Sequence, residues 1–70
     1  MRKADVVIGR TYVVRVSGRL VPVTLLFASI HGGWQGRNEY TDRRVRIKSA
    51  RRLRFQVVQV ERRWRRARVL

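Results

Sequence analysis

The chain has 70 residues, enough for one small domain and too few for an elaborate multidomain enzyme. Hydrophobic residues make up 44% of it, so a core can form, while 18 basic residues against four acidic ones give a net charge of +14. A charge excess of this size destabilises a compact monomer through self-repulsion and indicates a polyanionic partner, most commonly nucleic acid. Sixteen of the basic residues are arginines, whose planar guanidinium groups can grip phosphate with two hydrogen bonds.

The residues that usually carry catalysis or hold a metal ion are scarce. The chain has no cysteine and one histidine, His31, whose position before two glycines is typical of a turn. Its four acidic residues are scattered, so we expect no enzyme, no metal and no cofactor. The longest apolar run, residues 20–30, is shorter than the roughly 20 residues of a membrane helix. No signal-peptide pattern begins the chain, which predicts a cytoplasmic protein.

The first half of the chain has the pattern of short β-strands. Residues 11–16 are rich in β-branched side chains, the segment 17–19 supplies turn chemistry, and residues 20–30 form a nearly continuous apolar run. We expect Tyr12 and Phe27 in the core. Pro22 should lie near the start of its strand or on an edge, because proline lacks the N–H that a ladder needs.

Two further strands are expected between residues 34 and 48. The segment 34–40 follows a glycine pair and carries Gly36 in its interior, which is typical of a bulge or of close approach by another backbone. Residues 44–48 alternate strictly, so that two apolar side chains face one way and Arg44, Arg46 and Lys48 the other. Residues 49–53 then predict one helical turn capped by Ser49, and residues 54–58 a return to β structure.

The last dozen residues change character. Apolar side chains recur there at spacings of three and four between arginines, at Val57, Val60, Trp64 and Ala67. This spacing favours a short basic amphipathic helix with Trp64 as its docking anchor, although a strand that continues to residue 59 is also allowed. The domain prediction is therefore a β-barrel over residues 1–56, followed by a basic helix or tail over residues 57–70.

Residues 8–14 place a glycine ahead of the first long strand, and residues 45–53 run from a strand into a single helical turn. Together these segments resemble the SH3-like small barrels, the group that includes KOW, Tudor and several ribosomal and chromatin-associated modules. The resemblance implies a mainly β fold, a small five-stranded barrel, to which this chain adds its basic C-terminal helix. Residues 32–38 with 45–53 are also similar to short uncharacterised bacterial proteins, a likeness that implies no function.

The basic residues of the second half predict a nucleic-acid-binding surface. Along one strand face, Arg44, Arg46 and Lys48 would stand about 6.7 Å apart, a spacing that can follow a phosphate backbone. Trp34 and Tyr40 are candidates for stacking on bases, and Trp34 is equally well placed in the core. No motif for base readout is present, so we expect little sequence specificity, with DNA slightly favoured over RNA. The predicted contacts are Arg37, Arg43, Arg44, Arg46, Lys48, Arg51, Arg52, Arg54, Arg62, Arg63, Arg65 and Arg66.

Other interpretations remain open from the sequence alone. The chain could be a protein-interaction adaptor of mobile-element or phage origin, whose basic surface binds an acidic protein and whose groove, lined by Trp34 and Tyr40, holds a peptide. Residues 57–70 could instead anchor anionic lipid, although a membrane partner is disfavoured. A homodimer formed through edge strands would double the basic footprint.

Overall fold

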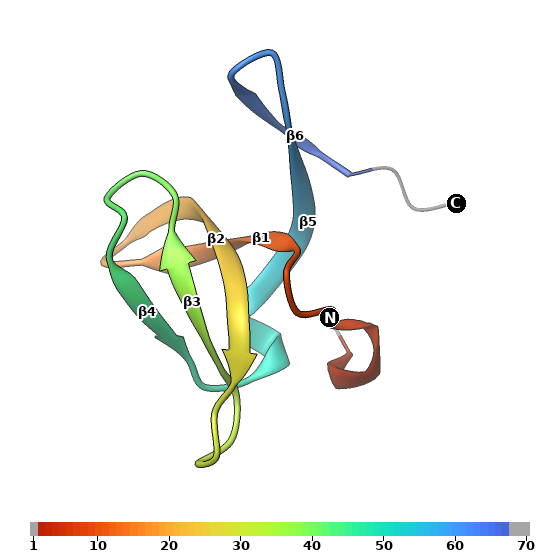
Figure 1. Ribbon diagram of the computed structural model, residues 1–70, viewed down its shortest axis with the longest axis vertical. Helices are drawn as coiled ribbons and strands as arrows, with labels where there is room; N and C mark the ends of the chain where they lie inside the picture. The colour runs from red at the N-terminus through yellow and green to blue at the C-terminus, as the bar shows by residue number, and fades with distance from the viewer. Residues whose placement is uncertain (1, 68–70) are drawn as a thin grey trace.

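The computed structural model describes residues 2–67, which form one antiparallel sheet of six strands (Figure 1). The strand order is β4-β3-β2-β1-β5-β6, so β4 and β6 are the two edges. The fold is therefore mainly β, as predicted. No helix in the described part of the chain has the length and apolar character needed to cross a membrane. The elements are η1 (Lys3–Asp5), β1 (Thr11–Val16), β2 (Arg19–Ala28), β3 (Trp34–Asn38), β4 (Arg44–Ile47), η2 (Ala50–Arg52), β5 (Leu53–Val60) and β6 (Arg63–Arg66), where η marks a 3-10 turn.

Strands β1 to β4 form a meander in which each strand pairs with the next. Val16 pairs with Arg19 across the first hairpin, which leaves a two-residue turn. Both turn residues have positive φ, 50° at Ser17 and 80° at Gly18, the arrangement of a type I′ turn, whose twist matches that of the flanking strands. The turn predicted after the first strand is confirmed. The second and third strands each end two residues earlier than expected.

Strand β5 returns beside β1, so the first strand of the chain lies inside the sheet. The register between β1 and β5 shifts at a β-bulge between the pairs Val14–Leu53 and Tyr12–Gln56. The one-turn helix expected before β5 is present as η2. The cap prediction is wrong, because the side chain of Ser49 makes no capping hydrogen bond and only its carbonyl oxygen accepts one, from the N–H of Arg52 at 3.1 Å.

The core lies on one face of the sheet, because the buried residues of neighbouring strands stand opposite one another in the ladders. Tyr12 is among the most deeply buried side chains, as predicted, and its hydroxyl accepts a hydrogen bond from the backbone N–H of Val7 at 3.0 Å. Partly buried side chains, Val45 among them, pack around this cluster. Its members are Tyr12, Val14, Val21, Val23, Leu25, Trp34, Ile47 and Leu53.

The prediction that Phe27 belongs to the core is wrong. Strand β2 contains a bulge between the pairs Leu25–Gly36 and Phe27–Gln35, and this extra residue turns the phenyl ring to the outer face, where 46% of the residue is exposed. Opposite the bulge, a Cβ atom on Gly36 would lie 2.5 Å from a methyl carbon of Val23. The same Cβ atom would lie 2.9 Å from the backbone oxygen of Thr24, so the predicted close approach by another backbone is present, and the bulge lies on the partner strand.

Pro22 lies near the start of β2, as predicted. Its carbonyl oxygen accepts a hydrogen bond from the N–H of Glu39, just beyond the end of β3. Because the N and O atoms of one strand residue point to the same side, the proline nitrogen also faces β3. Pro22 therefore lacks its N–H just past the last β2–β3 pair, Val23–Asn38, where the ladder does not need it. On the other side, Pro22 remains paired with Val13 of β1.

The basic C-terminal helix is not present in the described residues. Residues 57–66 instead form the end of β5 and strand β6, paired from Val57–Arg66 to Val60–Arg63. The spacing of apolar residues suggested a helix, but it also fits a hairpin whose two strands each carry apolar side chains, and the valines favour strand. The proposed boundary at residues 56 and 57 falls inside β5. Residues 68–70 of the predicted tail lie outside the described part of the chain.

Gly32 and Gly33 offer a matched test of the turn before β3, because both have positive φ, 92° and 71°. A Cβ atom on Gly32 would meet nothing within 4 Å, whereas one on Gly33 would collide with the carbonyl oxygen of Ile47. We expect Gly32→Ala to cost about 1–2 kcal/mol of stability from backbone strain alone. Gly33→Ala should cost at least about twice as much, measured by urea unfolding. Equal losses would show that the β4 backbone does not pack against this turn.

Candidate nucleic-acid interface

The outer face of β4 carries the basic row that the alternation predicted. Arg44 and Arg46 are exposed, while Ile47 is buried and Val45 partly buried on the opposite face. Lys48 continues the row just past the strand end and is also exposed. We call Arg44, Arg46 and Lys48 the β4 row. Because β4 is an edge strand, the row has no further strand beside it in the described structure.

Arg44 also covers the ring that the β2 bulge exposes. Its guanidinium carbon lies 5.4 Å from the centroid of the Phe27 ring, within the range of a cation–π contact. The contact holds the arginine side chain against the outer face of the sheet, where the phenyl ring stays partly open to water. An arginine held in this way loses less conformational freedom when it binds a phosphate.

Arg37 is the predicted contact residue that already has acidic partners. Its guanidinium group lies 3.1 Å from a carboxylate oxygen of Glu39 and 3.5 Å from one of Asp42. Glu39 is itself held by the hydroxyl of Thr24, which donates a hydrogen bond of 2.6 Å. Both acids compete with any phosphate for Arg37, so this residue is a weaker candidate than the sequence suggested.

Buried Asn38 organises the turn between β3 and β4. Its side-chain oxygen accepts a hydrogen bond from the N–H of Tyr40 at 2.9 Å, and its backbone bonds to both Arg43 and Asp42. Asp42 adopts a left-handed φ of 60°, which closes the turn. The result is a fixed loop that leaves Tyr40 65% exposed. Tyr40 therefore has an accessible ring, as a stacking residue requires.

A hollow of about 520 Å³ lies between this loop and the β1–β2 turn, and we call it the turn hollow. Arg19, Arg43 and Arg44 line it together with Tyr40, and Val21 and Val45 add apolar surface. Sequence reasoning missed Arg19. The signal was available, because in a meander the β1–β2 and β3–β4 turns lie at the same end of the sheet.

Trp34 lies in the core rather than on a surface that bases could reach. Only 7% of the residue is exposed, and it pairs with Ile47 of β4 on the inner face. A base cannot stack on a ring whose faces are covered by other side chains. Of the two roles that the sequence left open for Trp34, the structure leaves only that of a core residue.

The remaining predicted contacts fall into two groups. Arg51 and Arg52 on η2 and Arg54 at the start of β5 are exposed. The other group lies on the β5–β6 hairpin and comprises Arg62, Arg63, Arg65 and Arg66. Because β4 and β6 are opposite edges of the sheet, the arginines of the β4 row and those of the hairpin lie at different edges and do not form one continuous strand face. Charged residues on edge strands also prevent aggregation between sheet edges, and this role alone can account for some of the arginines on β4 and β6.

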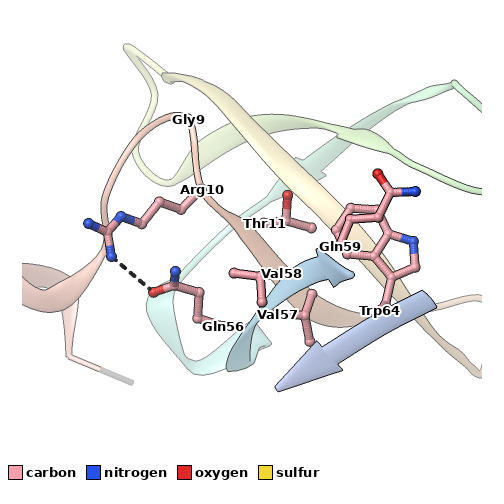
Figure 2. A pocket seen from close by; sticks show the side chains of 8 residues that line it. All are labelled: Gly9, Arg10, Thr11, Gln56, Val57, Val58, Gln59 and Trp64. Carbon is pink, nitrogen blue, oxygen red and sulfur yellow. Dashed lines mark hydrogen bonds between the residues drawn. The ribbon is translucent and has the colours of Figure 1, made fainter. Parts of the chain in front are cut away.

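The hairpin joins the sheet beside a shallow hollow of about 320 Å³ (Figure 2). Trp64 of β6 and Gln59 of β5 lie at one end, and the side chain of Arg10 hydrogen-bonds to Gln56 at the other, at 3.4 Å. Arg10 is the one charged residue among those that line the hollow, which is otherwise polar or apolar. This hollow therefore offers an anion fewer positive charges than the turn hollow, which three arginines line.

Neither a protein-family model, nor a curated protein, nor a solved structure matches this chain. Function must therefore be inferred from geometry and charge. Within residues 2–67 no group of three or more histidine, cysteine or acidic side chains is placed to hold a metal ion. What the described residues do offer is a set of exposed arginines, three of which line the turn hollow beside the exposed ring of Tyr40.

Proposed function

We propose that the protein binds nucleic acid with little sequence specificity and grips the phosphate backbone through arginines of the β4 row, η2 and the β5–β6 hairpin. One observation carries the proposal. Both salt bridges among residues 2–67 belong to Arg37, so the other eleven predicted contact residues have no acidic partner there. Unpaired cations at this density repel one another, and a polyanion relieves that repulsion.

The turn hollow supports a two-part contact with a nucleotide. Arginines at its rim offer charge-assisted hydrogen bonds to phosphate, and the exposed ring of Tyr40 offers a flat surface for an unpaired base. Neither contact reads a base sequence, which is why we propose low specificity. The burial of Trp34 removes half of the aromatic groove on which the peptide-binding alternative depended.

The architecture is part of the same proposal. A four-stranded meander, a 3-10 turn directly before β5 and a β5 that returns beside β1 support the resemblance to SH3-like small barrels. Strand β6 would then be an addition to the five strands of such a barrel. We propose that this small β scaffold holds the arginines in fixed positions, so that phosphate binding costs little ordering of the backbone.

The β4 row is tested by charge reversal. The triple variant R44E/R46E/K48E should bind mixed-sequence duplex DNA about 10²–10³-fold more weakly, because three charge-assisted contacts become repulsive. Its melting temperature should change little, since all three side chains are exposed. Fluorescence anisotropy and thermal melting provide the two measurements.

The matched control is R2E/K3E/R15E, which changes the net charge by the same amount at exposed residues outside the proposed contacts. This control should lose much less affinity than the β4 variant. Equal losses in the two triple variants would mean that net charge alone attracts the nucleic acid and that the β4 row is no binding surface.

A further inference from the structure

The β5–β6 hairpin leaves the body of the sheet. Pairing between β1 and β5 ends at Thr11–Val57, whereas pairing between β5 and β6 continues to Val60–Arg63. Residues 58–65 therefore form a two-stranded ribbon with no third strand beside it, and we call these residues the arm. Figure 1 shows the arm standing clear of β1 to β4. Such a ribbon is a separate structural element that extends beyond the rest of the sheet.

The two faces of the arm differ in chemistry. Paired residues in an antiparallel ladder point to the same side, so Val58, Val60, Arg63 and Arg65 share one face. On this face the two valines are 41% and 40% exposed, and both arginines are exposed. Trp64 lies on the other face and is half-buried against the hollow at the arm's base (Figure 2). The valine–arginine face is thus the one left open to a partner.

The base of the arm is fixed and its tip is strained. At the base, the guanidinium carbon of Arg66 lies 4.8 Å from the centroid of the Phe55 ring, and Ala67 donates a backbone hydrogen bond to Gln56 at 2.7 Å. At the tip, Glu61 and Arg62 have φ values of 50° and 66°, a turn that normally favours asparagine and glycine. Two-stranded ribbons are marginally stable alone, and strain of this kind points to a functional constraint.

We infer that the arm enters the major groove of duplex DNA with its valine–arginine face toward the base edges, an inference that rests on the proposed function. The major groove of B-DNA is about 12 Å wide and admits a two-stranded ribbon without deformation, whereas the minor groove, at about 6 Å, admits one only when the duplex is bent and the groove widened. The three residue pairs of the arm and its turn, at about 3.3 Å per step, give a ribbon about 10 Å long whose valine–arginine face can lie along the groove.

The chemistry of this face suits the groove floor. Arg63 and Arg65 can donate hydrogen bonds to guanine, and the valines can contact thymine methyl groups. Arg62 and Arg66 of the same hairpin remain available for phosphates. Duplexes of mixed sequence offer such guanines and methyl groups at many positions, so overall sequence specificity stays low. The major groove of duplex RNA is deep and narrow, so side chains cannot read it. The substrate class is therefore B-form duplex DNA, and duplex RNA of the same sequence should bind only through its phosphates.

The test is a competition between DNA and RNA duplexes of matched sequence and length for the full chain. We expect the protein to prefer DNA by at least about tenfold, and R63Q/R65Q to lose most of that preference. The matched control R44Q/R46Q removes two arginines from the other edge, so it should weaken binding to both duplexes and keep the preference. Thermal melting checks that both variants remain folded.

A second measurement locates the arm in the groove. Bulky groups on C5 of the pyrimidines, which fill the major groove, should weaken binding, whereas netropsin in the minor groove should not compete. Equal affinity for the DNA and RNA duplexes, or an unchanged preference in R63Q/R65Q, would overturn the arm inference and leave the proposed function standing. Failure to bind either duplex would overturn both.

Discussion

A fourfold rise in salt concentration, from about 50 to about 200 mM, is expected to weaken binding to duplex DNA roughly 10³-fold. Each phosphate that an arginine neutralises releases condensed counterions, and the logarithm of the affinity falls with slope about −0.9 per phosphate. With about six phosphates engaged, the slope is about −5. The eleven predicted contact residues without an acidic partner in residues 2–67 are more than enough for this number.

The measurement is a binding titration at several salt concentrations, plotted as the logarithm of the association constant against the logarithm of salt. The slope should become shallower by about one unit for each phosphate contact removed, so R44E/R46E/K48E should differ visibly from the unmodified chain. A flat line for the unmodified chain would contradict the electrostatic basis of the proposed function.

Ile47→Asp is expected to unfold the domain. Only 1% of Ile47 is exposed, and it belongs to the core cluster on the inner face of the sheet. A carboxylate at this position would be buried without a cationic or hydrogen-bonding partner or would force the strand away from the core, at a cost of several kcal/mol. A chain of 70 residues has a total stability of only about 4–10 kcal/mol, so most of it would be lost.

Arg46→Asp is the matched control, because it places the same carboxylate on the neighbouring residue, which faces outward. This variant should keep its melting temperature and bind DNA more weakly. Urea unfolding followed by circular dichroism separates the two variants. If Ile47→Asp melted like the unmodified chain, the register that places Ile47 opposite Trp34 would be wrong.

The elements that the sequence predicted well are those where side-chain periodicity and turn chemistry agree. Strand β1 has the expected bounds, and the alternation in β4 places Arg44 and Arg46 outside and Ile47 inside. The sequence of β4 alternates strictly, and in both strands the more buried side chains recur with a period of two, which specifies the side chains that face the core. The turn at Ser17 and Gly18 follows from residues that tolerate positive φ.

The errors have a common physical origin in backbone irregularity. One extra residue in β2 reverses the side to which Phe27 points, and no residue in the run from 23 to 27 signals the bulge. The hairpin at the C-terminal end turns at Glu61 and Arg62, which carry no turn signal, so a helical period fitted equally well. The direction of Phe27 and the C-terminal hairpin depend on a bulge and on pairing between strands, and a local sequence pattern does not predict either.

The site was predictable in part for the same reason. Residues on the regular strand β4 could be placed on a face, but the acidic partners of Arg37 come from the β3–β4 turn, whose shape depends on buried Asn38. That Arg19 and Arg43 line one hollow was foreseeable, because a meander brings the β1–β2 and β3–β4 turns to the same end of the sheet. A count of charges shows that cations are in excess, and only the folded chain shows which of them are unpaired.

The position of β1 between β2 and β5 has a consequence for synthesis in the cell. Because β1 leaves the ribosome before β5, one of its sides stays unpaired until β5 has been made. Until then a row of free backbone groups and valine side chains is open to association with other nascent chains. The rate at which β5 pairs with β1 should therefore limit the fraction of newly made protein that escapes aggregation.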